Sequence, residues 1–513
     1  MSLFEVLNIS KGNYAPLFES LSKYEIERNF TIDKKQLKSI LNILPTNYSV
    51  VLEYFYVDKV FRSSYYNYYA SKHFDINRFC VRLCFFKLSD IHIDDFYNSE
   101  KRFMLQESFM GFTVVQPISI GSIGRTYLNP HKINLGQCYV RTTIFNIVIL
   151  GLLLEVETYP FSSQNSETMT CAETSLWTIS EYFGTRYSNY RIYSPSEIGQ
   201  IQSDIDFQKS MPSKGLSYIQ SSHILKKIGF SPRVYYRYKS NENDDEIYEG
   251  GEFKRLFHYY IESGIPFIAG IKAQKGNTPI GHAVVCIGHG CKSEAKVAPS
   301  QLNDLYFVDS SKYYSDYVIN DDNQLPFKIE KFNSPSLYTN AKFKYFIAPL
   351  YNRIFLEAKD AYTIVTNILK NVNYGIGKIL TDKELNYSKS NPLVIRFFLT
   401  SARKYKAYRS ENYPHIGLAR VYTQIPFPKF IWVAELSIES EFQKENIFGE
   451  IILDATASRF SMESAIISIH YPGYIGYRTP DESIETLFTR LEINYPGLNG
   501  FYPVYVNNLV KVV

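Results

Sequence analysis

A cysteine at the predicted start of a helix is the first residue in this chain whose position favours chemistry. Cys171 follows Thr170, and Glu173 stands three residues after that threonine, which is the capping-box pattern of a helix start. Unpaired backbone amides and the positive end of the helix dipole stabilise a thiolate there. Because the thiolate is the reactive form of cysteine, Cys171 is the candidate nucleophile. The alternative is a cysteine that only packs in the core.

A histidine in an apolar strand is the candidate base. His282 follows Gly281 and opens the run 283–287, so the pattern predicts a strand that begins at the histidine. A strand would hold an imidazole rigidly within reach of a thiol, and the preceding glycine leaves room for a close neighbour. The nearby His289 falls seven residues later, where strand alternation turns it to the opposite face. Cys286 is expected to pack in the core.

An acidic residue at the end of the next predicted strand is the candidate partner of the imidazole. Asp309 ends the apolar segment 305–309, so it would lie at the rim of a buried sheet. A carboxylate beside an imidazole fixes its tautomer and stabilises the imidazolium, which in turn favours the thiolate. The alternative is an ordinary turn residue that ends a strand.

The order of these residues along the chain is that of papain-like folds: a cysteine opens a helix, and a histidine and an acid follow on later strands. Residues 155–350 resemble the peptidase C39-like branch of that superfamily, through Gln164 ahead of Cys171, Gly281–Val285, and Val308–Asp309. Both flanks lie outside the resemblance.

The resemblance implies a nucleophile, a proton carrier, an orienting acid and an oxyanion donor, and these roles fall on Cys171, His282, Asp309 and Gln164. Two positions depart from the family pattern. Gln164 precedes the cysteine by seven residues, where the family usually has six, so Asn165 is a second candidate for the oxyanion donor. Ala172 stands where glycine is common, a change that a helix accepts easily.

The elements around these residues predict an α+β fold in three parts. Residues 1–154 mix helices with short β segments and have no assigned role. Residues 155–350 form the papain-like domain, and residues 351–513 form a second α+β domain with a structural or substrate-positioning role. In that last part His415 and His470 have no acidic neighbours in sequence, so no reaction centre is predicted there.

Within the papain-like domain the helices come first and an antiparallel sheet follows. The predicted helices are 171–183, stopped by Gly184, then 217–228, stopped by Gly229, and 252–263, stopped by Gly264. The predicted strands are 265–271, 282–287 and 305–309. The helix thus carries the cysteine, and the sheet carries the histidine and the acid.

Charge and hydropathy restrict the classes of partner. A net charge of +4 on 513 residues argues against a nucleic-acid binder, which normally has a basic face. The acidic stretch 242–252 is expected to be a solvated loop. The most apolar run, 144–154, is about half the length that spans a bilayer, and we expect buried strands meeting near Gly151. No membrane partner is therefore predicted.

The cysteines favour a reducing compartment. Six scattered cysteines are few for a secreted disulfide scaffold, and no signal peptide pattern opens the chain. Neither the pair Cys80 and Cys84 nor the pair Cys286 and Cys291 has the spacing of a zinc site. We expect a bacterial cytoplasmic protein with no metal and no cofactor.

The predicted function is that of a cysteine peptidase acting on a protein or peptide substrate. Thiolate attack on a peptide or isopeptide amide would form an acyl-enzyme. One alternative keeps the chemistry and changes the acceptor, as in a transglutaminase, deamidase or acyltransferase, and fold alone does not choose among these. The other alternative is a catalytically inert binding module. A complete set of Cys, His, Asp and Gln argues against it, because binding alone does not require them.

Overall fold

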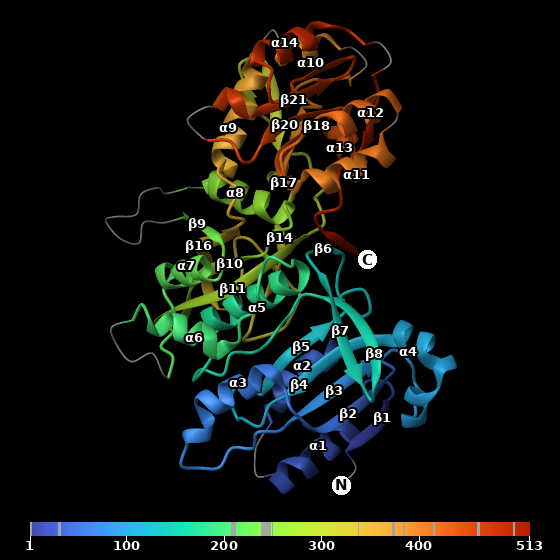
Figure 1. Ribbon diagram of the computed structural model, residues 1–513, viewed down its shortest axis with the longest axis vertical. Helices are drawn as coiled ribbons and strands as arrows, with labels where there is room; N and C mark the ends of the chain where they lie inside the picture. Colours follow the sequence, from blue (N-terminus) through green and yellow to red (C-terminus); the bar gives the residue numbers. More distant parts are fainter. Residues whose placement is uncertain are drawn as a thin grey trace.

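The computed structural model describes residues 3–513 apart from 29–31, 207–211, 238–247, 249, 337, 372–374, 383–384, 414–415, 459–461 and 496–497. His415 and most of the predicted acidic loop lie outside the described residues. The fold is mixed α+β with largely antiparallel sheets, as the sequence predicts. Three main sheets follow one another along the length of the molecule, from the N-terminal one at the bottom of Figure 1 to the C-terminal one at the top. Among the described helices, none has both the length and the apolar character needed to cross a membrane.

The N-terminal sheet is a five-stranded antiparallel meander. Its strands are β1 (Phe4–Ile9), β2 (Tyr48–Tyr56), β3 (Cys80–Phe86), β4 (Phe109–Val115) and β5 (Ile123–Leu128), and its helices are α1 (Ala15–Arg28), α2 (Lys34–Asn42), α3 (Lys59–Asn67) and α4 (Arg102–Ser108). A separate hairpin, β7 (Thr143–Ile149) and β8 (Leu152–Thr158), turns at Gly151. Ile144, Val148 and Leu153 on its outer face are exposed. The expectation of fully buried strands is therefore right for one face and wrong for the other.

The middle sheet carries the candidate histidine. In spatial order its strands are β15 (Lys328–Lys331), β14 (Asp316–Asn320), β11 (Thr278–Gly290), β10 (Phe267–Lys275), β16 (Thr339–Leu350) and β9 (Ser231–Tyr236). Two short strands join it beside β11: β6 (Cys138–Val140) and, paired to β6, β24 (Val510–Val512) near the end of the chain. The helices of this part are α5 (Cys171–Arg186), α6 (Pro195–Ser203), α7 (Tyr218–Lys227) and α8 (Gly250–Glu262).

The C-terminal sheet has seven strands. In order they are β12 (Ser300–Leu302), β13 (Leu305–Asp309), β17 (Leu393–Ser401), β18 (Phe430–Ile438), β20 (Gly449–Asp454), β21 (Ile466–Tyr471) and β22 (Tyr474–Tyr477). A two-stranded pair, β19 (Asn446–Ile447) and β23 (Tyr502–Pro503), lies apart from it. The helices are α9 (Ala358–Lys370), α10 (Ile376–Thr381), α11 (Ala402–Asn412), α12 (Ile416–Gln424), α13 (Glu439–Phe442) and α14 (Ile484–Glu492).

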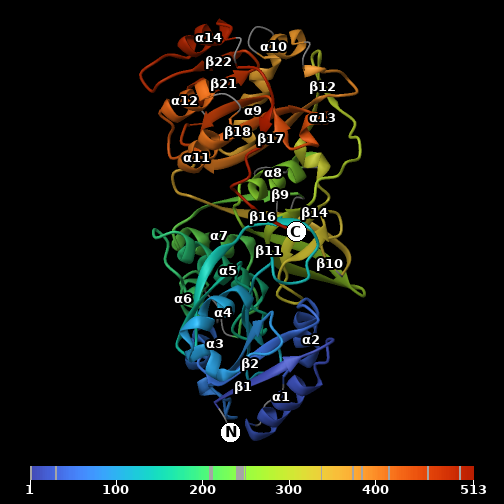
Figure 2. The ribbon, with the colours of Figure 1, turned by 90° about the vertical axis from the view of Figure 1, so that its right-hand side faces the viewer.

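Strand pairing crosses the boundaries predicted at 154 and 350. β12 and β13 belong to the middle part by sequence, yet β13 pairs in parallel with β17 in the C-terminal sheet. Conversely, β6 and β24 come from the flanks and extend the middle sheet. α8 lies between the middle and C-terminal sheets, and its apolar residues belong to one core shared by both (Figure 2). The middle and C-terminal parts are therefore built into each other.

Two element boundaries differ from the prediction. α5 continues through Gly184 to Arg186, and a Cβ at Gly184 would come within 2.6 Å of Ile192. This glycine therefore serves close packing and does not stop the helix. β11 begins at Thr278, so His282 lies inside the strand and does not open it. By contrast, α7 and α8 end as predicted, because Gly229 and Gly264 both adopt positive φ.

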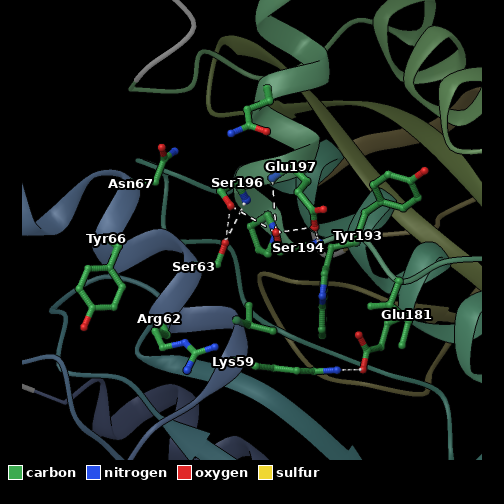
Figure 3. A pocket seen from close by; sticks show the side chains of 15 residues that line it. Lys59, Arg62, Ser63, Tyr66, Asn67, Glu181, Tyr193, Ser194, Ser196 and Glu197 are labelled. Atoms are coloured by element: carbon green, nitrogen blue, oxygen red, sulfur yellow. Dashed lines mark hydrogen bonds and ion pairs between the residues drawn. The ribbon is translucent and has the colours of Figure 1, made fainter.

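Polar contacts join the N-terminal part to the middle part (Figure 3). Lys59 of α3 forms a 2.5 Å ion pair with Glu181 of α5, and Ser63 lies 2.8 Å from Ser196 of α6. These contacts surround a hollow of about 540 Å³. They fix the helix that carries the candidate nucleophile against the N-terminal sheet.

Candidate active site

Cys171 is the first residue of α5, as the capping-box pattern predicts. Thr170 is the N-cap with extended backbone, and its N–H donates to a carboxylate oxygen of Glu173 at 3.2 Å. The hydroxyls of Thr170 and Ser213 also donate to that carboxylate. The half-buried thiol therefore lies at the amino end of a 16-residue helix, where the helix dipole favours negative charge.

His282 lies on β11 with its imidazole in contact with Cys171 and with two aspartates. Its Nε2 is 2.9 Å from Oδ1 of Asp321 and 3.6 Å from Oδ1 of Asp322, and the imidazole is hydrogen-bonded to the Cys171 side chain. Because Nε2 faces the aspartates, Nδ1 is the ring nitrogen left for the thiol. The side chains thus form the series thiol, imidazole, carboxylate.

The electrostatics of this cluster favour a protonated imidazole. Burial alone would lower the pKa of His282, but the hydrogen bonds to Asp321 and Cys171 and the charges of both aspartates raise it well above its usual value. Burial likewise opposes ionisation of Asp321, yet the hydrogen bond from His282 and its charge hold the pKa of Asp321 below its usual range. A charged imidazole is the partner that a thiolate needs.

Asp321 is fixed by the strand and turn that carry it. It directly follows β14, which pairs with β11 through Asn320 opposite Val285. Oδ1 of Asp321 accepts a 3.0 Å hydrogen bond from the N–H of Asn323, and Oδ2 accepts one from the side chain of Gln324. The carboxylate is therefore rigidly oriented towards His282, as a group that fixes a tautomer must be.

Asp309, the acid predicted from sequence, does not lie beside His282. It ends β13, opposite Ile395 in the C-terminal sheet. Its carboxylate accepts hydrogen bonds from the Tyr259 hydroxyl and from the N–H of Ser311 at 3.0 Å. The expected arrangement, an acid at the end of the strand next to the histidine strand, does occur. The strand next to β11 is β14, however, so the acid there is Asp321.

The two candidate oxyanion donors, Asn165 and Gln164, differ in how many hydrogen bonds their side chains already form. Asn165 is buried, and its side-chain oxygen accepts from the N–H groups of Glu167, Thr168 and Met169. Its Nδ2 donates to the hydroxyl of Thr168 at 2.8 Å, so the amide is committed to its own turn. Gln164 is half-buried, and its Nε2 lies 2.5 Å from Oδ1 of Asn323, in the turn that carries Asp321. Gln164 is therefore the better candidate.

The neighbouring residues on β11 have structural surroundings. Nε2 of His289 is 3.2 Å from Glu262 of α8, and its ring stacks on Tyr139, so it is directed away from the Cys171 cluster. Cys286 is fully buried in the core, as expected. A Cβ at Gly281 would meet no atom within 4 Å, so the expectation that a neighbour approaches closely there is wrong.

Tyr345 lies near the cysteine, and Tyr218 lies next to Tyr345. Burial and the nearby Cys171 and Tyr218 side chains raise the pKa of Tyr345 to about 12. The rings of Tyr345 and Tyr218 lie with centroids 5.5 Å apart, and Tyr345 packs directly over Gly270 of β10. These aromatic side chains form an apolar border beside the thiol.

One group of described residues has the geometry to hold a cation. Ligand atoms of His282, Asp321 and Asp322 lie within 4.8 Å of one another. A metal at Nε2 would have to replace the proton that links His282 to Asp321. Burial raises the pKa of Asp322 to about 7, with Asp321 adding to the rise and His282 opposing it. The hydrogen bond between His282 and Asp321 accounts for those two side chains, whereas both carboxylate oxygens of Asp322 are buried without a hydrogen-bond partner among the described residues.

The sequence contained a signal for Asp321 that the strand order obscured. Residues 316–320 form a short β-rich segment, and two acids follow it directly, whereas the segment 305–309 ends in one acid. Both segments have the same local pattern, so which strand lies beside β11 decides between them. Comparison with known proteins does not help, because no protein-family model and no curated protein matches the chain.

Proposed function

We propose that this protein is a cysteine hydrolase that cleaves a peptide or isopeptide amide, with Cys171 as nucleophile and His282 as its base. The hydrogen-bonded series Cys171–His282–Asp321 is the observation that carries the proposal. Asp321 takes the orienting role that the sequence assigned to Asp309. The capped start of α5 supplies the second contribution to thiolate stability.

In the proposed mechanism His282 takes the proton of the Cys171 thiol, and the thiolate so formed is the nucleophile. The raised pKa of His282 keeps the imidazole charged at neutral pH, and Asp321 holds its Nε2 proton so that Nδ1 stays directed at the sulfur. The thiolate attacks the carbonyl carbon of the substrate amide. This step forms the C–S bond and moves one electron pair onto the carbonyl oxygen.

The oxyanion is held by the backbone N–H of Cys171 and by the side chain of Gln164. The Gln164 amide has two N–H groups, so it can keep its hydrogen bond to Asn323 and direct the second at the oxyanion. Collapse of the intermediate breaks the C–N bond, and His282 protonates the leaving amine. Water activated by His282 then hydrolyses the thioester and restores the thiolate.

The peptidase C39-like, papain-like assignment of residues 155–350 belongs to this proposal, with a protein or peptide as substrate. The residues that support it are Gln164, Cys171 and His282, which the fold brings to one place. We place the activity in a bacterial cytoplasm, where a reducing environment keeps the protein's six free cysteines as thiols.

The first test is the rate of carbamidomethylation by iodoacetamide at neutral pH, read for each cysteine by peptide mass spectrometry. Cys291 is exposed and serves as the internal reference thiol. Cys171 is expected to react faster than Cys291 although it is less exposed, and to slow roughly tenfold in His282→Ala. His289→Ala is the matched control, because it removes a histidine from the same strand. Reaction of Cys171 no faster than Cys291, or unchanged in His282→Ala, would refute the thiolate–imidazolium pair.

The products identify the reaction. The full-length protein is incubated with a peptide library, with Cys171→Ala as the blank, and new peptide termini are counted by mass spectrometry. New termini that depend on Cys171 support hydrolysis. Ammonia release or incorporation of an added primary amine, without new termini, would replace hydrolysis by deamidation or transamidation on the same acyl-enzyme. A reactive Cys171 that yields none of these products would contradict the proposed hydrolase.

A further inference from the structure

A second, larger cavity lies at the other end of α5, between the middle and C-terminal parts. Its volume is about 770 Å³. It is lined by the carboxyl end of α5, the turn after α8 at Gly264, residues 351–353, the amino end of α11 and the segment 427–430. At about 1.5 Å per residue, the 16-residue α5 places this cavity roughly 20 Å from Cys171. It is therefore distinct from the candidate active site.

The lining of this cavity is strongly cationic. Among the described residues that line it, six carry positive charge and none is a carboxylate: Arg141, Arg186, Arg353, Arg403, Lys404 and Lys429. Among the residues that the structure describes, none of these six forms an ion pair with a carboxylate. The whole chain has 55 Lys and Arg against 51 Asp and Glu, so composition does not explain the imbalance.

Arg141 gives the sharpest evidence of missing negative charge. Its buried guanidinium donates to the hydroxyls of Tyr182 at 2.5 Å and Tyr187 at 3.1 Å and to the backbone oxygen of Asn508, none of which is a carboxylate. The other buried arginines in the described part of the chain each contact a carboxylate: Arg82 with Glu53, Arg125 with Asp58, and Arg409 with Glu435. A buried charge without a counterion is costly, so Arg141 is the exception that requires a reason.

Two neighbouring groups respond to the same excess of positive charge. Burial would raise the pKa of Tyr187, yet Arg141 and Arg186 lower it to about 7. Burial lowers the pKa of Lys404, and the charges of Arg141 and Arg186 add to that effect and bring it to about 8. Both directions are those expected where negative charge is lacking.

The amino end of α11 adds to the positive potential. Ser401 is its N-cap, and Arg403 and Lys404 occupy the first turn, where acidic residues normally complement the helix dipole. Placing two cations there costs stability unless an anion is bound between them. The hollow of Figure 3 differs, because the carboxylates Glu181 and Glu197 line it, and Glu181 is paired with Lys59.

Aromatic side chains supply an apolar wall. The rings of Tyr351 and Phe430 stack in the cavity with centroids 4.8 Å apart, and Tyr190 and Phe427 also line it. A volume of about 770 Å³ exceeds what a single inorganic anion fills and matches a small organic ligand. Arginines, lysines and a helix amino end together are the groups that bind phosphate oxygens.

We propose that this cavity binds a small organic molecule that carries phosphate groups, held between Arg141 and Arg186 of the middle part and the amino end of α11. The ligand supplies the counter-charge that these residues lack and links the middle part to the C-terminal part. This binding does not depend on the proposed hydrolase activity, because no residue of the Cys171 site takes part in it.

The test is isothermal titration calorimetry on the full-length protein with tripolyphosphate, ATP and citrate at matched ionic strength. Tripolyphosphate and ATP are expected to bind with one-to-one stoichiometry, with ATP tighter because its base meets the aromatic wall, and citrate weaker than both. The double variant Arg186→Gln/Lys404→Gln should weaken binding at least about tenfold. Arg420→Gln, an exposed cation of the same part outside the cavity, is the matched control and should bind as the wild type does.

Three outcomes would overturn the proposal. Absence of binding by both phosphate probes at millimolar concentration excludes a phosphate site. Equal weakening in the double variant and in Arg420→Gln shows general attraction to a basic surface. Tighter binding of citrate than of tripolyphosphate assigns the cavity to carboxylate ligands. Far-UV circular dichroism of each variant confirms the fold, and labelling of Cys171 reports separately on the active site.

Discussion

Two of the buried histidines, His282 of the middle part and His470 of the C-terminal part, are driven to opposite charge states. His282 lies in contact with two aspartates, which raise its pKa well above the usual value. His470 lies on β21 with its Nδ1 3.0 Å from the Tyr502 hydroxyl, and burial lowers its pKa to about 4 although Glu450 opposes the shift. Burial is similar at the two positions, so the partners decide the charge.

The difference lies in how negative charge is distributed. In the C-terminal part Arg409 contacts both Glu435 and Glu450, and Arg396 contacts Glu435 and Glu262, so each carboxylate already has a cation. Around His282 the aspartates have an imidazole as their cation, and that cation depends on a proton. A fully paired network stabilises a fold, whereas charge that relies on a movable proton is suited to catalysis.

The largest effect is expected from replacing, one at a time, the two aspartates that are candidates for orienting His282. Asp321→Asn should slow any Cys171-dependent turnover by roughly 10²–10⁴-fold, because the carboxylate that orients His282 and stabilises its imidazolium is lost. Labelling of Cys171 should slow by no more than about the tenfold expected for His282→Ala. Asp309→Asn should leave both rates unchanged, since Asp309 contacts Tyr259 and Ser311. Labelling and turnover are measured on both variants after their folding is confirmed. If Asp309→Asn lost labelling and turnover while Asp321→Asn kept both, Asp309 would be the orienting acid, as the sequence predicts.

The second prediction tests the claim that the C-terminal network is structural. Glu450→Gln leaves Arg409 with one of its two carboxylates and should cost about 3 kcal/mol of unfolding free energy. Trp432 is buried in β18, so its fluorescence in a Trp177→Phe background reports urea unfolding of this part. Labelling of Cys171 should not change. Glu19→Gln, which removes an exposed ion pair with Lys23, is the control with no measurable loss. Slower Cys171 labelling in Glu450→Gln would mean that the two regions are coupled.

The third prediction uses pH. The folded-state pKa of His470 is about 4, below the unfolded value of about 6.5, so its contribution to stability is present above pH 6.5 and is lost as the pH falls towards 4. The loss should approach roughly 3 kcal/mol, and it should be absent from His470→Gln.

His282 behaves in the opposite way, because its raised pKa contributes stability at low pH that is lost as the pH rises. Urea unfolding of His470→Gln, His282→Ala and the wild type between pH 4 and 8 measures how the unfolding free energy changes with pH in each protein. If both substitutions changed the pH dependence of the unfolding free energy in the same direction, the two histidines would not have opposite charge states.

Local pattern predicted the elements that carry Cys171 and His282, but not which aspartate lies beside His282. Thr170 and Glu173 form the capping box because both partners lie within one turn of helix. His282 lies on its predicted strand for the same local reason. The acid depends on which strand pairs with β11, because β13 ends in Asp309 and β14 is followed directly by Asp321. Non-local pairing makes that choice: sequence order alone favours Asp309, whereas the fold places Asp321 beside His282 and Asp309 beside Tyr259.

The glycines also show that sequence predicts local structure better than contacts between distant segments. Gly229 and Gly264 end helices as predicted, because a positive φ at a helix end is a local requirement. Gly184 was predicted to end α5, yet it accommodates Ile192, a contact from a following loop that periodicity does not reveal. Gly281 is expected to leave room for a close neighbour, but no described atom lies within 4 Å of the position that a Cβ would take there. Local backbone demands are thus visible in the sequence, whereas close packing is not.

The smallest effects are expected at the two glycines that flank the site on β10 and β11. At Gly281 a Cβ meets open space, so Gly281→Ala should change stability by less than about 0.5 kcal/mol and leave Cys171 labelling unchanged. At Gly270 a Cβ would overlap the ring of Tyr345, so Gly270→Ala should cost about 1–3 kcal/mol and alter labelling by moving the aromatic border. Urea unfolding and labelling rates on both variants give the comparison. A strong effect at Gly281 would mean that a partner or substrate approaches the strand there, because the protein itself places nothing against that position.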